Sequence, residues 1–66
     1  MPSLRYPCFY VFKDTRDEWR WTFYGRAGDE IASSTESYAS ASDCMPSIKA
    51  IQDSATVEIF REREDE

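Results

Sequence analysis

Two short aromatic runs joined by a polar linker most constrain what this chain can fold into. Residues 8–13 have the sequence CFYVFK and residues 19–24 have the sequence WRWTFY. Aromatic and β-branched residues are typical of strands. In the second run Trp19, Trp21 and Phe23 alternate with their neighbours at the period of a half-buried strand. The linker is of hairpin length. These features together predict an antiparallel hairpin.

The rest of the chain predicts a third strand, a helix and a fourth strand. Gly28 lies in a turn before a short strand at residues 30–34. Residues 56–60 alternate again and predict the last strand. Between these strands apolar residues recur every third or fourth position, which indicates an amphipathic helix; they are Ala41, Cys44, Ile48, Ile51 and Ala55. The predicted class is α+β, a β-β-β-α-β unit with an antiparallel meander packed on one helix.

The start of the helix has two candidate caps. Ser40 and Asp43 have the spacing of a capping box. A proline inside a helix removes a hydrogen bond, so Pro46 is expected in about the first turn. That placement favours Ser42 over Ser40 as the cap. Asp53 and its neighbour Ser54 are weak helix formers, so the helix is expected to end before Ala55.

The length of the chain predicts association. A chain of 66 residues buries about 60% of the surface that its unfolded form exposes. At roughly 0.05–0.15 kcal/mol per residue, its stability alone is about 3–10 kcal/mol. Small domains often add a disulfide, a metal or a partner subunit. The chain has two cysteines and no histidine, too few ligands for a structural zinc site. We therefore expect a homodimer.

Composition limits location and function. The N-terminus lacks the apolar run of a signal peptide, and no stretch approaches the roughly 20 apolar residues of a membrane span. We expect a cytoplasmic protein with both thiols reduced. The net charge of −5 opposes non-specific binding to polyanions, which needs a surplus of Lys and Arg.

Catalytic chemistry is not expected. A thiol nucleophile normally needs a base such as histidine, which the chain lacks. Cys44 lies near the predicted helix start, which would lower its pKa, but it also lies on the apolar stripe, which favours burial. The acidic residues near the turns lack the spacing of a calcium loop. No catalytic, metal or cofactor-binding residue is predicted, and carboxylates in a dimer cleft are the one enzymatic alternative.

The predicted sheet has a core face and an open face. Trp19, Trp21 and Phe23 are expected to pack on the helix, whose own large apolar residues are few. The opposite face is a candidate partner surface, because a sheet face exposed to solvent seldom carries three aromatic residues. Its residues are Tyr10, Phe12, Arg20 and Tyr24. The alternative is weak binding of single-stranded nucleic acid, whose bases stack on aromatic side chains beside arginine.

The order of these motifs resembles the YegP-like domain, a small bacterial family of unknown function. The resemblance covers about residues 9–58 and rests on Lys13-Asp14, Trp19-Arg20-Trp21, Gly28 to Ser34, Glu36-Ser37-Tyr38 and Ser47-Ile48. It implies a single domain at 8–60, and the run of charged residues at 61–66 predicts a disordered tail after it. It also implies that two units join into one sheet by exchanging C-terminal strands, so a one-unit chain would be a homodimer.

The chain departs from the family pattern at three positions. Ser37 and Ser47 stand where the family usually has glycine, and Pro46 falls within the helix start. A serine at position 47 is expected to widen the gap between helix and sheet. The family has no established catalytic or binding residues, so the resemblance implies none here.

Overall fold

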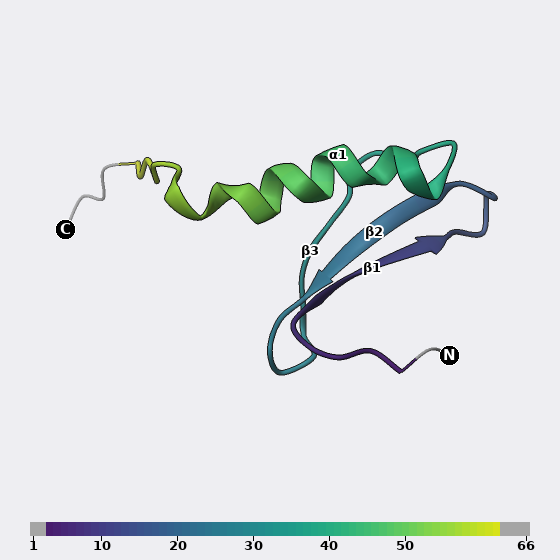
Figure 1. Ribbon diagram of the computed structural model, residues 1–66, viewed down its shortest axis with the longest axis horizontal. Coiled ribbons are helices and arrows are strands. Elements are labelled where there is room, and N and C mark those ends of the chain that lie inside the picture. The colour runs from purple at the N-terminus through teal and green to yellow at the C-terminus, as the bar shows by residue number, and fades with distance from the viewer. Residues whose placement is uncertain (1–2, 63–66) are drawn as a thin grey trace.

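A three-stranded antiparallel sheet with one helix across it forms the fold (Figure 1). The computed structural model describes residues 3–62. Its elements are β1 (Cys8–Lys13), β2 (Trp19–Tyr24), β3 (Glu30–Ser33), α1 (Ala41–Gln52) and a short 3-10 helix η1 (Asp53–Thr56). The α+β class and the meander are as predicted from the sequence, with β3 one residue shorter than expected.

The register of the sheet decides which side chains share a face. Phe9 pairs with Phe23 and Val11 pairs with Trp21 across β1 and β2. Paired residues point to the same side of an antiparallel sheet, so these four side chains form the face beneath α1. The pairing of β2 with β3 is interrupted by an irregularity beside Tyr24.

The core is small and lies between β2 and α1. Three apolar residues are buried in the described chain: Trp21, Cys44 and Ile48. Partly buried side chains surround them, namely Phe9, Val11, Trp19, Phe23 and Tyr38. The predicted burial of Trp21 and Cys44 is thus confirmed, and Trp21 is the largest of the three core side chains.

The helix start differs from the prediction at two residues. Ser40, not Ser42, is the N-cap: its backbone is extended, and its Oγ accepts a hydrogen bond of 3.3 Å from the backbone N–H of Asp43. Pro46 therefore lies in the second turn of α1. Its missing N–H leaves the carbonyl of Ser42 without a helical donor, and this is tolerated because Ser42 is exposed to water.

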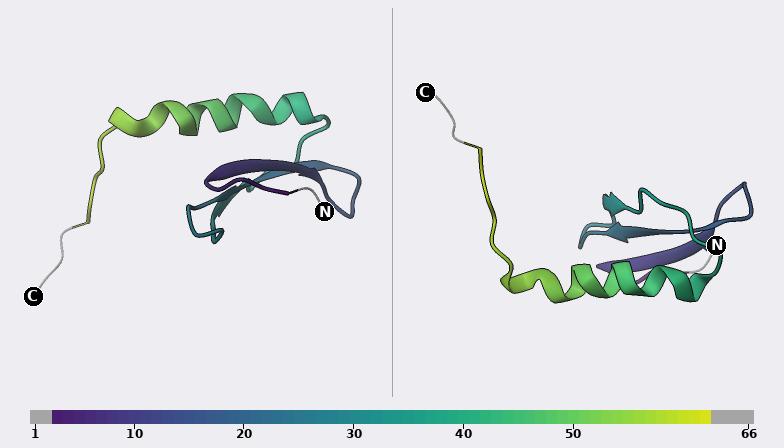
Figure 2. Two further views of the ribbon diagram at one scale, coloured as in Figure 1. Left: turned by 60° about the horizontal axis from the view of Figure 1, so that its bottom comes forward. Right: turned by 90° about the horizontal axis from the view of Figure 1, so that it is seen from above.

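The predicted fourth strand is absent from the described residues. Thr56 belongs to η1, and residues 57–60 are extended without a strand partner. Helix α1 runs well past the end of the sheet and carries the following segment away from it (Figure 2). For the same reason Ile51, predicted to be in the core, is 41% exposed. The charged tail predicted at 61–66 lies outside the described residues from 63 onward.

The chain is extended for its length. Its Cα radius of gyration is 14.5 Å, whereas a compact chain of this size has about 11 Å. The overhanging part of α1 and the segment after it account for the difference (Figure 1). The sheet and α1 as far as Ile48 thus form the packed unit, and the end of α1 with the segment after it projects from it.

Candidate interaction surfaces

The four predicted surface residues lie on one side of the sheet. Phe12 pairs with Arg20 across β1 and β2, while Tyr10 and Tyr24 occupy positions of the same parity. All four therefore point away from α1, and we call them the aromatic face. The rings of Tyr10 and Phe12 stack with 5.6 Å between centroids and 16° between planes. The side chains are half-buried by one another and remain accessible to a partner.

One further aromatic residue joins this face without having been predicted. The ring of Tyr6 meets that of Tyr24 edge-on, with 5.7 Å between centroids. Tyr6 lies in the irregular segment before β1, where no periodicity indicates a face. Its ring also lies against Gly28, whose φ of +84° belongs to the turn before β3. Tyr6, from the segment before β1, thus extends the aromatic face past the end of the strands.

Arg20 is held by an ion pair rather than presented as a free cation. Its Nε donates to Asp14 Oδ2 at 2.7 Å. The other oxygen of Asp14 accepts the backbone N–H groups of Arg16 and Glu18 at 2.8 and 3.0 Å. The Arg20 hydrogen bond, followed by that of Glu18, lowers the pKa of Asp14. This pairing reduces the attraction of the aromatic face for phosphate groups.

A second apolar surface follows α1. Val57, Ile59 and Phe60 are 63%, 87% and 88% exposed, and we call them the apolar tail. Side chains of this kind gain roughly 1.5–3 kcal/mol each on burial. Single exposed apolar residues are common on proteins, but three within four positions make this segment a candidate interaction surface.

The Ser47 hydroxyl joins the helix to the sheet. It accepts hydrogen bonds from Trp21 Nε1 at 2.9 Å and from the hydroxyl of Tyr38 at 3.3 Å. It donates in turn to the carbonyl of Cys44 at 2.9 Å. The sequence did not reveal this role. The available signal was a serine in place of glycine opposite a buried tryptophan, whose N–H needs an acceptor.

The thiols have different environments. Cys44 has no exposed surface, and burial, followed by the charge of Asp43, raises the pKa of its thiol. Burial favours Cys44 as a core residue, and the raised pKa of its thiol opposes the alternative of a reactive thiol at the helix start. Cys8 is half-buried. Within residues 3–62 no three potential ligands gather around a metal position, and no pocket is enclosed.

Comparison with known proteins places this geometry in a family. The family model described as "Domain of unknown function (DUF1508)" matches residues 14–60. The chain belongs to this family. DUF1508 is the YegP-like domain that the sequence motifs resemble, so the resemblance is confirmed.

A solved structure has the same fold as this DUF1508 chain. It is described as the NMR solution structure of the protein from Haloferax volcanii. It is 30% identical in sequence, with a TM-score of 0.69 over 85% of this chain and 93% of the other. A search of curated proteins finds no match. No helix among the described residues of the DUF1508 chain has the length and apolar character of a membrane span.

Proposed function

We propose that this DUF1508 chain is a non-enzymatic homodimeric binding module whose two copies exchange their C-terminal segments. The observation that carries the proposal is the apolar tail, which projects from the packed unit with most of its apolar surface exposed. Burying its two aliphatic side chains, Val57 and Ile59, against a second copy would contribute about 3–6 kcal/mol. That is comparable with the whole stability of about 3–10 kcal/mol for a chain of this length.

The small core supports the same proposal. Three buried apolar residues are few for an independent domain, and chains of this length often obtain further burial from oligomerisation. Both cysteines are free in the described structure, so no disulfide takes that role. A second copy would supply the missing burial with the segment that each copy leaves exposed.

The chemistry of the side chains supports a binding role over a catalytic one. The Cys44 thiol is buried and its pKa is raised, so it is a poor nucleophile. The Asp14 carboxylate is occupied by Arg20 and by two backbone N–H groups. The aromatic face is instead shaped for contact, with two stacked rings on an accessible side of the sheet. We propose it as the surface through which the dimer contacts its target.

Light scattering coupled to size exclusion tests the dimer. At micromolar concentration the full chain is expected to have twice the chain mass of 7.7 kDa. The substitution Ile59→Asp places a charge in the apolar tail and should return the mass to that of one chain. Glu58→Gln, on the neighbouring position, is the matched control and should remain dimeric. A mass near 7.7 kDa for the full chain at high concentration would refute the proposal.

A further inference from the structure

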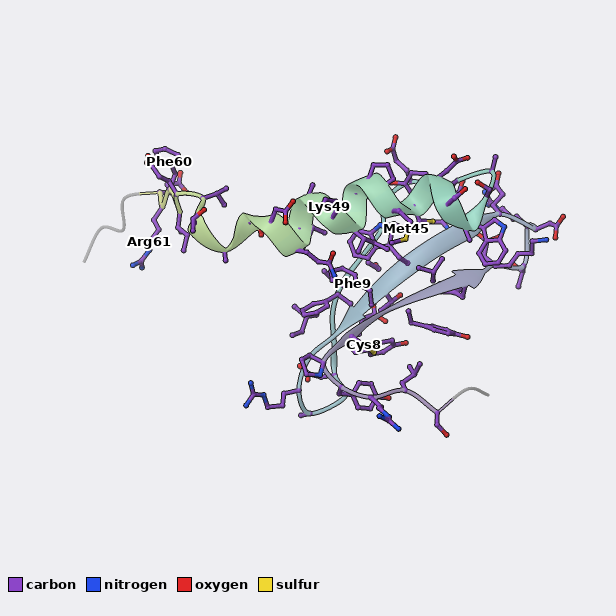
Figure 3. All side chains as sticks on the ribbon, viewed as in Figure 1. Cys8, Phe9, Met45, Lys49, Phe60 and Arg61 are labelled. Carbon is purple, nitrogen blue, oxygen red and sulfur yellow. The ribbon has the colours of Figure 1, made fainter. Side chains whose placement is uncertain are left out.

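We infer that the aromatic face binds a proline-rich segment of another protein that carries basic residues beside its prolines. This inference rests on the proposed binding module and adds to it the chemistry of the target. The aromatic face lies on the side of the sheet away from α1, and no helix or strand of the described chain covers that side (Figure 2). In Figure 3, Cys8 lies farther from α1 than its neighbour Phe9, as the alternation along β1 requires. Cys8 therefore belongs to the same open side.

The aromatic rings form two groups along the sheet. Tyr10 and Phe12 stack, so their pair is centred level with the residue between them. Tyr24 lies opposite Cys8, and the ring of Tyr6 meets it at that end. The two groups are thus three strand residues apart, which corresponds to about 10 Å.

This spacing matches the repeat of a polyproline II helix. That helix has three residues per turn and rises about 3.1 Å per residue, so one face repeats about every 9 Å. Prolines in successive turns would therefore each pack on one of the two ring groups. Proline-rich segments bind aromatic-lined surfaces in this way, because their bound conformation is already formed in the free segment.

A row of hydroxyl groups crosses the sheet beside the stacked rings. Thr22 of β2 lies between Tyr10 of β1 and Ser33 of β3, and paired residues share a face. Within residues 3–62 none of these three hydroxyls has a hydrogen-bond partner. They are therefore free to donate to a ligand, whereas the hydroxyls on the helix side of the sheet are engaged with Trp21.

Thr22 lies at the bottom of a narrow opening in this face. It is only 4% exposed. No buried side-chain oxygen of the described chain lacks a partner, so the unpaired Thr22 oxygen must retain contact with solvent. An enclosed hydroxyl has few water contacts to lose and gains from an added acceptor. The backbone carbonyls of a polyproline II segment are such acceptors, because they make no hydrogen bonds within the segment.

The shape of the face favours an extended ligand over a small one. Small-molecule sites are concave and bury most of their ligand, and the described residues enclose no pocket. The rings and hydroxyls are instead spread over all three strands. A segment that crosses the sheet would touch them in succession.

The charge of the chain favours a basic segment. Its 13 acidic and 8 basic residues give a net charge of −5, which attracts cations and repels polyanions at long range. Arg20 is neutralised by its ion pair, whereas the exposed Glu30, opposite Tyr24, has no ion pair among the described residues. The exposed loop residues Arg5 and Arg26 do not outweigh this acidic excess. A lysine or arginine beside the prolines would meet the Glu30 carboxylate.

Fluorescence anisotropy with the full chain tests the ligand class. The probe is a labelled peptide of about nine prolines, three turns of the helix, with an arginine at each end. We expect this peptide to bind more tightly than the same prolines with a glutamate at each end. A glycine run between the same arginines should lose the binding. Equal affinity for the three peptides would overturn the inference.

Oligothymidylate is the competing probe and represents single-stranded nucleic acid. Tighter binding of oligothymidylate than of the arginine-flanked prolines would overturn the inference and assign the face to a polyanion. No peptide binding by a chain that light scattering shows to be dimeric would overturn the inference while leaving the dimer intact. A monomer by light scattering would show instead that the proposed dimer has failed.

Two variants test whether the aromatic face is the binding surface. Thr22→Val removes an unpaired hydroxyl, so the Tm should not fall, while the affinity should fall roughly twofold to tenfold, the value of one hydrogen bond. Thr35→Val, at an exposed position outside the strands, is the matched control and should bind as the parent does. Tyr10→Ala removes a stacked ring and should weaken binding about tenfold or more. Parent affinity in both Thr22→Val and Tyr10→Ala would overturn the aromatic face as the site.

Discussion

At the scale of single residues, the Ser47 hydroxyl links the helix to the core tryptophan. It satisfies the N–H of the buried Trp21 and the hydroxyl of Tyr38 at the junction of helix and sheet. A buried donor that loses its partner costs about 1–3 kcal/mol. Ser47 therefore adds polar contacts to a core that contains few buried apolar residues among those described.

The substitution Ser47→Ala tests this contribution. It should lower the free energy of unfolding by about 1–3 kcal/mol, because Trp21 Nε1 would lose its acceptor. Urea denaturation followed by tryptophan fluorescence measures the change. Gln52→Ala, at an exposed position of the same helix, is the control and should change stability little. Equal stabilities for the two variants would show that the Ser47 contacts do not stabilise the fold.

A second prediction at this scale concerns Asp14 and pH. Its folded-state pKa is lowered, chiefly by the Arg20 hydrogen bond. The contribution of ionised Asp14 to folding stability is therefore complete above its unfolded-state pKa of about 3.9. It is lost as the pH falls through the lower pKa of the folded state. Asp14→Asn should lower the Tm at pH 7 and reduce the further fall in Tm below about pH 4.

Thermal melts at a series of pH values between about 2 and 7 measure this dependence. Glu36→Gln, an exposed substitution of equal charge change, is the control and should retain the parent profile. An Asp14→Asn profile that parallels the parent at every pH would contradict the assigned role of the Arg20–Asp14 pair.

At the scale of elements, the strands were predictable and the helix ends were not. The alternation in WRWTFY is a local property of the chain, and it fixed β2 and its two faces. The choice between Ser40 and Ser42 as cap was decided by whether the helix tolerates Pro46 in its second turn. That depends on the exposure of the Ser42 carbonyl, which is a property of the packed helix and not of the local sequence.

The segment after α1 shows a different limit of sequence reasoning. Its alternation predicted a strand, but a strand needs a partner, and the described chain offers it none within reach. The candidate surface was predictable to the same extent. Alternation placed Tyr10 and Arg20 on one face, whereas the Asp14 partner of Arg20 and the added ring of Tyr6 come from turns without periodicity.

A pair of truncations tests the role of this segment. Removing residues 57–66 deletes the apolar tail and should abolish the dimer, with a loss of about 3–6 kcal/mol from two aliphatic side chains that are no longer buried. Removing residues 61–66 spares the apolar tail and should leave the mass unchanged. Light scattering and thermal melting follow both variants. A longer truncation that remains dimeric would exclude exchange of this segment.

At the scale of the whole molecule, the packed unit buries few apolar side chains. Its core contains one fully sequestered side chain, Cys44, among the described residues. The extended shape and the exposed apolar tail support the proposed dimer, in which each copy would gain burial from the other. On this proposal, the folding stability rises with the concentration of the chain, because dimerisation stabilises the folded state by mass action.

The irregular, acidic edge of β3 has a consequence for how far such a structure can grow. Strand β3 forms one margin of the sheet. This margin is short, irregular in register and marked by the exposed Glu30. A further chain would meet a poor strand template there. The same strand that contributes least to the core would then guard the protein against fibre formation, the characteristic hazard of open β-sheets.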